Sequence, residues 1–267
     1  MTRPEENPGR APRPWLLAET SWGELRRSPC DLAVLPWGAT EAHNFHLPYA
    51  TDVYETAFIA AEAGRLASEA GARVLVLPTL PFGVQAGQLD IPYCINLMPS
   101  TQAAILGDII DALEGQEVRK LVLLNGHGGN DFRATIRELQ ASTGIFLCTI
   151  NWWSCVDARP FFEQPGDHAG ELETSAMLHI APELVRPLAS AGTGQARPFR
   201  VAGLREGWAW APRQWTSVTD DTGVGDPAAA TAAKGAAFLD AVTRRIAAFL
   251  TELAAADTAD LYMDLPR

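Results

Sequence analysis

Acidic side chains and histidines gather in one short stretch that directly follows an apolar run, Leu32–Leu35. Within a dozen residues this stretch contains Glu41, His43, His46 and Asp52. Carboxylate oxygens combined with neutral imidazole nitrogens suit zinc, manganese or iron, whereas an oxygen-only set would favour calcium or magnesium. If the stretch is extended, Glu41 and His43 project to the same side, because side chains alternate along a strand. Taken alone, the stretch is equally compatible with ordinary loop histidines and an Asp52 that caps the following helix.

A second stretch, Asn125–Asn130 (NGHGGN), places three glycines around a single histidine, His127. It follows another predicted strand, so we expect it at the same carboxyl edge of the sheet as the first stretch. Glycine permits sharp turns and close approach to a ligand, and the G-x-G-x-x-G spacing of a dinucleotide site is absent. A purely structural glycine turn explains this stretch, taken alone, equally well.

A third stretch, Asp167–Ser175, begins a predicted helix that reaches about Ile180 and contains His168, Glu171 and Glu173. The two glutamates are two residues apart and therefore point about 200° away from each other on a helix, so at most one can face a site. Glutamates at a helix start also compensate the helix dipole, which is the alternative explanation. Four of the five histidines lie in the three stretches, and this clustering favours a common site.

The elements that must position these stretches alternate along the chain. Apolar runs predict strands at 32–35, 73–77, 120–124 and 145–150, separated by helices at 52–71, 100–116 and 131–142, with Ser100 capping the second of these. This alternation implies right-handed crossovers and a parallel sheet covered on both faces, a three-layer α/β/α sandwich. An alanine-rich helix is predicted at 227–256, and a long polar loop at 78–99 is expected to be functional or disordered.

Composition limits the classes of function. The 267 residues are 47% hydrophobic, enough for one domain or two, and 21 basic against 32 acidic residues give a net charge of -11. This charge argues against nucleic acid or an anionic membrane as a partner. No signal-peptide-like or membrane-spanning apolar run is present, and the four cysteines form no C-x-x-C pair. We expect a soluble, cytoplasmic protein with reduced cysteines and a flexible arm at residues 1–14.

The three stretches together resemble the creatininase (creatinine amidohydrolase) family: GATEAH running on to Asp52, then NGHGGN, then HAGELETS. A fourth segment, Thr222–Pro227 running on to Lys234 and Gly235, resembles the C-terminal turn of that family. The resemblance covers about residues 30–240. It implies a single domain over residues 15–267, two divalent metal ions (zinc, manganese or iron) and a homo-oligomer, usually a hexamer.

The resemblance also implies a ligand set. Glu41 and His127 would hold one metal, His43 the other, and Asp52 would bridge the two. Creatininase itself has a glutamate ligand where this chain has Gly129. The missing carboxylate is therefore expected from Glu173. His168 would carry a proton and Glu171 would orient it.

The predicted chemistry is hydrolysis of a C–N bond in a small cyclic amide or related compound. Two metal ions lower the pKa of a bound water so that hydroxide can attack, and His168 protonates the leaving nitrogen. Creatinine itself is not the expected substrate, because the loop at 78–99 lacks the histidine that many members carry. Two other substrates stay open: an inosose-like cyclic keto-sugar, suited to the polar loop residues Gln85, Gln88, Asp90 and Asn96, and a peptide trimmed during cofactor maturation.

Five tryptophans could wall the pocket or simply pack in the core and at subunit contacts: Trp152, Trp153, Trp208, Trp210 and Trp215. A hypothesis from a different class of function is a metal-binding protein that has lost catalysis. It is motivated by Gly129, which leaves a ligand position vacant. A nucleotide-binding α/β module is the third hypothesis. The central histidine of NGHGGN and the carboxylates elsewhere argue against it.

Overall fold

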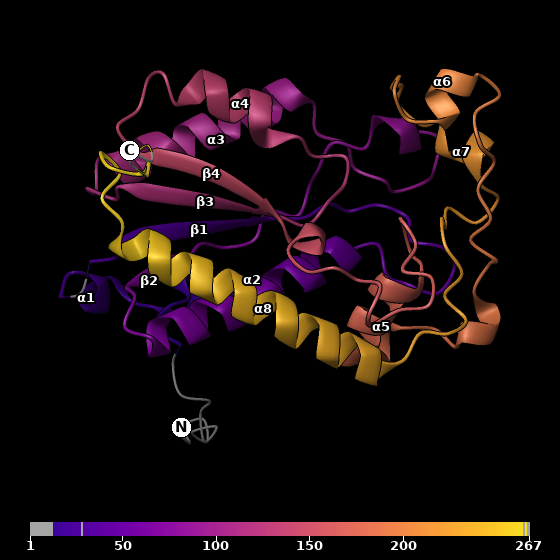
Figure 1. The fold of residues 1–267 in the computed structure, drawn as a ribbon, viewed down its shortest axis with the longest axis horizontal. Coiled ribbons are helices and arrows are strands. Elements are labelled where there is room, and N and C mark those ends of the chain that lie inside the picture. The colour runs from indigo at the N-terminus through magenta and orange to yellow at the C-terminus, as the bar shows by residue number, and fades with distance from the viewer. Residues whose placement is uncertain (1–12, 28, 264, 266–267) are drawn as a thin grey trace, which may run out of the picture.

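The computed structural model describes residues 13–27, 29–263 and 265, so the arm predicted at residues 1–14 lies outside them except for its last two residues. Four parallel strands form one sheet in the order β2-β1-β3-β4 (Figure 1). They are β1 (Leu32–Trp37), β2 (Val74–Val76), β3 (Lys120–Asn125) and β4 (Phe146–Asn151). The four predicted strands are confirmed, with ends that differ by one or two residues.

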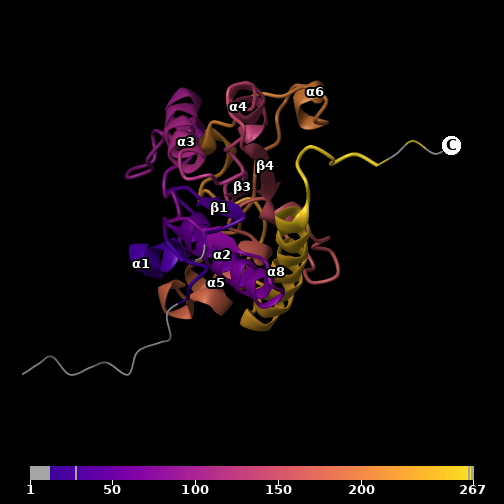
Figure 2. The same cartoon turned by 90° about the vertical axis from the view of Figure 1, so that its left-hand side faces the viewer.

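Helices cover both faces of this sheet (Figure 1, Figure 2). On one face lie α2 (Thr51–Glu69), α5 (Glu171–Ile180) and α8 (Ala232–Ala255), and on the other lie α3 (Pro99–Glu114) and α4 (Phe132–Leu139). The shorter helices are α1 (Trp22–Leu25), α6 (Ala202–Arg205), α7 (Trp215–Val218) and the 3₁₀ turns at Leu17–Glu19, Ala86–Gln88, Trp152–Ser154, Pro182–Leu184 and Leu188–Ser190. The predicted three-layer α/β/α sandwich is confirmed.

The strands are apolar throughout because both of their faces are buried. Leu32 and Val34 of β1 pack into the core beneath α2 and α8, whereas Ala33 and Leu35 pack into the core beneath α3 and α4. The same alternation holds in β3. None of the helices in the described part of the chain has the length and apolar character needed to cross a membrane.

Three predicted helix boundaries were wrong. Helix α2 begins at Thr51 with Ala50 as its N-cap, so Asp52 lies inside the first turn and does not cap it. Helix α3 begins at Pro99, a residue whose fixed φ suits the first helical position, so the predicted cap Ser100 is helical. The C-terminal helix begins at Ala232, where the Thr231 side chain accepts a hydrogen bond from the Lys234 N–H, and residues 227–230 precede it as a turn.

The strand order determines where loops can form a site. From β1 the chain crosses to β2 on one side, and from β2 it crosses back to β3 on the other side of β1. The loops that leave β1 and β3 therefore diverge at the carboxyl edge, which is where open parallel sheets bind ligands. Trp37 at the end of β1 pairs with Asn125 at the end of β3, so the first two polar stretches start side by side.

Helix α8 crosses α5 at a glycine. A Cβ added to Gly235 would lie 1.9 Å from the Ser175 carbonyl oxygen, so the two helices can approach this closely only without a side chain. Gly107 in α3 is the opposite case, because an added Cβ there meets nothing within 4 Å.

We predict that Gly235→Ala lowers the free energy of unfolding by about 1–3 kcal/mol or more, because the backbones must separate. Gly107→Ala should raise it by about 0.5–1 kcal/mol, because alanine loses less entropy in a helix. Urea unfolding followed by circular dichroism measures both. Equal changes in the two variants would contradict the close crossing.

Candidate metal centre

Asp52 lies at the middle of a buried polar cluster. It projects from the first turn of α2 and is 1% exposed. Its Oδ1 lies 2.9 Å from His43 Nε2, and its Oδ2 lies 3.0 Å from His127 Nδ1. Because each oxygen faces a different imidazole, Asp52 can be shared between two cations.

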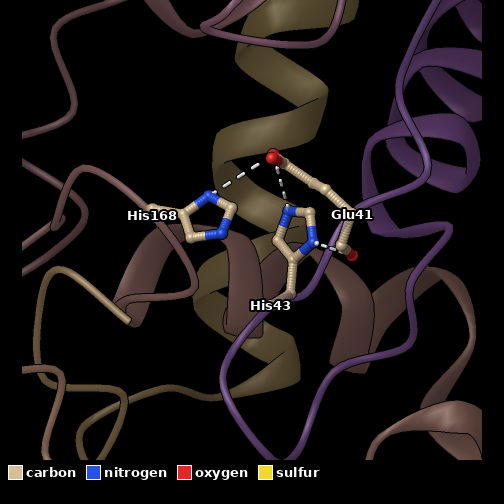
Figure 3. A group of neighbouring side chains, drawn as sticks. All are labelled: Glu41, His43 and His168. Atoms are coloured by element: carbon tan, nitrogen blue, oxygen red, sulfur yellow. Dashed lines mark hydrogen bonds and ion pairs between the residues drawn. The ribbon is translucent and has the colours of Figure 1, made fainter. Parts of the chain in front are cut away.

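Glu41, in the loop after β1, faces the same imidazoles with one oxygen. Its Oε1 lies 3.0 Å from His127 Nδ1, 3.7 Å from His168 Nδ1 and 4.0 Å from His43 Nε2. Figure 3 shows His43 and His168 on either side of this carboxylate, with their rings 4.2 Å apart. The structure thus brings together side chains from all three polar stretches.

The three histidines share one orientation. In each ring the outer nitrogen lies near a backbone carbonyl oxygen: His43 Nδ1 is 3.2 Å from Glu41, His127 Nε2 is 2.9 Å from Val84, and His168 Nε2 is 2.8 Å from Ala42. A carbonyl oxygen can only accept, so the outer nitrogen carries the proton and the inner nitrogen turns its lone pair toward the carboxylates. Histidines that bind metals are held in this way.

The electrostatics of the cluster require positive charge between these groups. Burial by itself lowers the pKa of His43, but the charge of the adjacent Asp52 carboxylate outweighs burial and raises this pKa to about 10. The pKa of His127 is likewise raised well above its ordinary value, since Glu41 and Asp52 outweigh burial. The pKa of Asp52 is lowered, because His43 and His127 outweigh the effect of burial.

Two buried atoms show that the site fits cations. His43 Nε2 and Asp52 Oδ2 have no partner in hydrogen-bonding geometry among the described residues, although each lies about as close to an opposite group as a hydrogen bond would be. A lone pair that faces an anionic oxygen at this distance needs a proton or a metal ion between them. The donor set of imidazole nitrogen and carboxylate oxygen suits zinc, manganese or iron.

The ligand atoms form two groups that share Asp52. Glu41, Asp52 and His127 offer atoms that lie within 4.8 Å of one another, and so do His43, Asp52 and Glu173. A third group contains Glu41, His43 and His168. All five predicted metal ligands are therefore brought together. Glu173, from the first turn of α5, also accepts the Ala169 N–H at one oxygen.

Glu171 points away from the cluster, as expected for a residue two positions from Glu173 on a helix. It is fully buried, and its carboxylate accepts from Lys234 Nζ at 2.5 Å and from the Gln164 N–H at 2.8 Å. The pKa of Glu171 is lowered, because these two donors outweigh burial. In the described part of the chain, no hydrogen bond or ion pair joins Glu171 to His168. The structure places Glu171 where it secures α5 to α8, not where it could orient His168.

Gly129 is the position for which the family resemblance implies a glutamate ligand, and the surrounding atoms exclude any side chain there. A Cβ at this position would be 2.0 Å from the Val84 carbonyl oxygen and 2.5 Å from His127 Nε2. The Val84 carbonyl that orients His127 therefore occupies the space of the missing ligand. A carboxylate can reach the cluster only from another direction, and Glu173 does so.

Three neighbours of the cluster were not predicted: Gln88, Glu55 and Thr174. Gln88 Nε2 donates to Glu41 Oε2 at 2.5 Å, and the Thr174 hydroxyl lies 2.8 Å from His46 Nε2. Burial and then the charge of His43 lower the pKa of His46 to about 4. The His46 imidazole is therefore neutral near pH 7.

Glu55 is fully buried in α2, one turn beyond Asp52, and neither of its carboxyl oxygens has a hydrogen-bond partner among the described residues. Burial, followed by the charges of Glu173 and Asp52, raises the pKa of Glu55 well above its ordinary value. A glutamate three residues from Asp52, on the same helix face, is the sequence signal that could have found it.

A cavity of about 630 Å³ adjoins the cluster and has aromatic walls. Trp215 lies 4.7 Å from the His168 ring, and Trp152, Trp153 and Trp210 also line the cavity. Trp208 is 78% exposed and does not line it. Four of the five tryptophans considered as pocket walls therefore have that position, although Trp152 is also part of the core.

The segment at Thr222–Pro227 holds His168 in place. Val224 and His168 form an antiparallel bridge, with the Val224 N–H donating to the His168 carbonyl at 2.7 Å and the reverse bond at 3.1 Å. The Thr222 hydroxyl accepts from the Asn44 N–H at 2.8 Å. This fourth segment thus connects the first and third polar stretches.

This geometry defines an α/β/α protein with a candidate centre for two metal ions at the carboxyl edge of its sheet. The family model described as creatininase, creatinine amidohydrolase, matches residues 18–250. The chain therefore belongs to the creatininase family, whose members are hydrolases.

Curated relatives differ in their substrates. The mycofactocin precursor peptide peptidase of Mycobacterium tuberculosis is 30% identical over 235 residues, covering 82% of this chain and 86% of the relative. The creatinine amidohydrolase of Pseudomonas putida is 29% identical and covers 63% and 73%. The 3-dehydro-scyllo-inosose hydrolase of Thermotoga maritima is 26% identical and covers 60% and 53%.

Solved structures share the fold over nearly the whole chain. A creatinine amidohydrolase-like protein from Bacteroides fragilis is 43% identical with a TM-score of 0.87, covering 94% of this chain and 99% of that chain. A creatininase variant in a zinc–zinc form is 25% identical with a TM-score of 0.71, covering 90% and 98%.

We predict two metal ions per wild-type chain, none in Asp52→Ala, and fewer than two in Glu173→Ala. Removing Asp52 deprives both groups of a ligand, whereas removing Glu173 deprives one. Elemental analysis of proteins purified without chelator measures the metal content. Glu171→Gln, on the same helix but outside the cluster, is the matched control and should retain both ions. Two ions in Asp52→Ala would refute the bridging role.

Proposed function

We propose that this chain is a metal-dependent hydrolase that cleaves an amide C–N bond. The observation that carries the proposal is the shared orientation of His43, His127 and His168, whose inner nitrogens face buried carboxylates. Asp52 offers one oxygen to each of the two ligand groups. Two cations held there would supply Lewis acidity and an acidified water.

His168 is suited to carry the proton that amide cleavage needs. Its Nε2–H is donated to the Ala42 carbonyl oxygen, which leaves Nδ1 free to accept a proton at the edge of the cluster. Its ring lies between His43 and Trp215, so it is fixed in orientation. In this role His168 takes a proton from the attacking water and passes it to the leaving nitrogen.

The cavity favours an amide larger than a single small ring. Its volume of about 630 Å³ lies in the range of sites that bury drug-sized ligands. A small cyclic amide would fill only part of it, whereas a peptide end with an apolar side chain could contact the aromatic walls. Similarity to a precursor peptide peptidase supports this second candidate, a peptide amide.

A cyclic keto-sugar is a weaker candidate, because the loop residues expected to bind its hydroxyls are already engaged. Gln88 bonds to Glu41, Gln85 donates to the Thr40 carbonyl oxygen, and Asp90 accepts from Gln214 and Thr216. The hypothesis of a metal-binding protein without catalysis is also less well supported, because Glu173 can supply the carboxylate that Gly129 cannot.

The test is hydrolysis by the metal-loaded protein of a panel containing lactams, cyclic ureides, formamides and short peptides with an apolar C-terminal residue. Amine release from at least one amide, abolished by chelator and restored by zinc or manganese, is the expected result. A protein that binds two metals and cleaves none of the panel would favour the non-catalytic hypothesis.

We predict that His168→Ala retains both metals but lowers turnover of the cleaved amide by roughly 10²- to 10⁴-fold, the usual contribution of an acid–base group. Metal content and steady-state rates measure the two effects. His179→Ala, on the exposed side of α5, is the control and should change neither. Loss of a metal in His168→Ala would show that His168 is a ligand together with Glu41 and His43.

The homohexamer implied by the family resemblance stays a prediction.

A further inference from the structure

The loop at 78–99 delivers one fully buried side chain onto a predicted metal ligand. Gln88 ends the short 3₁₀ turn Ala86–Gln88 and has no exposed surface. Its Nε2 lies 2.5 Å from Glu41 Oε2. Among the described residues, no other side chain donates a hydrogen bond to that oxygen.

The orientation of the Gln88 amide is determined by its other neighbours. Its Oε1 accepts from the backbone N–H of Ala42 at 3.2 Å and from the Cys94 Sγ–H at 3.2 Å. A backbone N–H can only donate, so the amide oxygen must face Ala42. The NH₂ group therefore faces Glu41. If the amide were flipped, its NH₂ group would face the Ala42 N–H, and two donors would point at each other.

This contact gives the two carboxylate oxygens of Glu41 different partners. Oε2 is held by Gln88, whereas Oε1 faces the imidazoles of His127 and His168. Glu173 is divided in a similar way, because one of its oxygens accepts the Ala169 N–H. Asp52 differs, since its two oxygens face His43 and His127.

We propose that Gln88 is a positioning residue that makes Glu41 offer a single oxygen to the metal centre. The proposal rests on the metal-dependent function proposed above. Without the amide, the Glu41 carboxylate is free to rotate and to present both oxygens, which changes the number and geometry of donors. Hydrogen-bond partners of metal ligands typically contribute 10- to 100-fold to metal affinity.

Gln88 is itself tied to the wall of the substrate cavity. Two residues further on, Asp90 accepts from Gln214 Nε2 at 3.0 Å and from the Thr216 hydroxyl. The segment that contains Gln214 also contributes Arg213 and Trp215 to the cavity. One loop therefore connects the aromatic wall to a metal ligand.

The experiment compares Gln88→Met and Gln88→Glu with Gln85→Met. Gln85 is a matched control, because it is buried in the same loop but donates its amide to the Thr40 carbonyl oxygen instead of to Glu41. Each metal-free protein is titrated with Co²⁺ in competition with a chelator, and the visible absorption of bound Co²⁺ is recorded. Thermal unfolding of the metal-free proteins checks that each variant is folded.

We expect Gln88→Met to bind Co²⁺ 10- to 100-fold more weakly and with an altered absorption spectrum. Gln88→Glu should lose at least as much affinity, because it replaces the donor with a second negative charge against Glu41. Gln85→Met should match the wild type in affinity and spectrum.

Wild-type affinity and spectrum in Gln88→Met would overturn the positioning role while leaving the metal centre intact. Equal losses in Gln85→Met and Gln88→Met would also overturn it, because the effect would then belong to the loop as a whole. A wild-type protein that binds no Co²⁺ would refute the proposed function itself.

Discussion

The structure depends on a constraint of charge: buried carboxylates and imidazoles face one another at about 3 Å. Burying such groups unpaired costs several kcal/mol per ion, so they must be neutralised by one another and by a cation. The pKa values of His43 and His127 are raised and the pKa of Asp52 is lowered for this reason, because protonated imidazoles neutralise the buried carboxylate. Metal ions that bind there must displace those protons, so metal affinity and proton release are coupled. Hydrogen bonds from the three imidazoles to backbone carbonyls, and from Gln88 to Glu41, hold the charged groups in these positions.

The fold satisfies this constraint by drawing on separate parts of the chain. The loops after β1 and β3 start beside each other at the sheet edge, and Asp52 projects from the first turn of α2. Glu173 comes from the first turn of α5, and His168 comes from the segment just before that helix. Backbone carbonyls of Glu41, Val84 and Ala42 then fix the three imidazoles. Because these acceptors are backbone atoms, the orientation of the rings depends on the path of the loops more than on the identity of any side chain. The substrate cavity opens onto this rigid edge.

Much of this arrangement could be predicted from the sequence. Apolar runs and helical periodicity predict the four strands and five main helices, because both follow from local chemistry. Residue types indicate Glu41, His43 and Asp52 as possible ligands and His127 as a candidate, whereas Glu173 was expected only from the family resemblance. Helix starts were less predictable: Asp52 and Ser100 have good capping side chains, but Ala50 and Met98 occupy the cap positions. The contact partners of Glu171 and Gln88 could not be predicted, since Lys234 and Glu41 lie 63 and 47 residues away from them. Glu171 was expected to orient His168 because carboxylates commonly orient groups of a metal site in this way, but three-dimensional packing directs its carboxylate to Lys234 of α8 and the Gln164 N–H.

The absence of a side chain at Gly129, together with Glu173 on α5, connects the proposed metal centre to the proposed choice of substrate. With no side chain at position 129, the loop at 78–99 can lean onto the cluster, so that Val84 orients His127 and Gln88 holds Glu41. Most polar side chains of that loop are then bonded within the protein, although Gln85 Oε1 has no hydrogen-bond partner among the described residues. We therefore expect substrate recognition to depend more on the other side of the cavity, where Trp210, Arg213 and Trp215 lie. A wall of this kind selects apolar surface and shape more than a pattern of hydroxyl groups. Under the proposed function, the glycine at position 129 therefore favours an amide substrate with an apolar side chain over a sugar-like one.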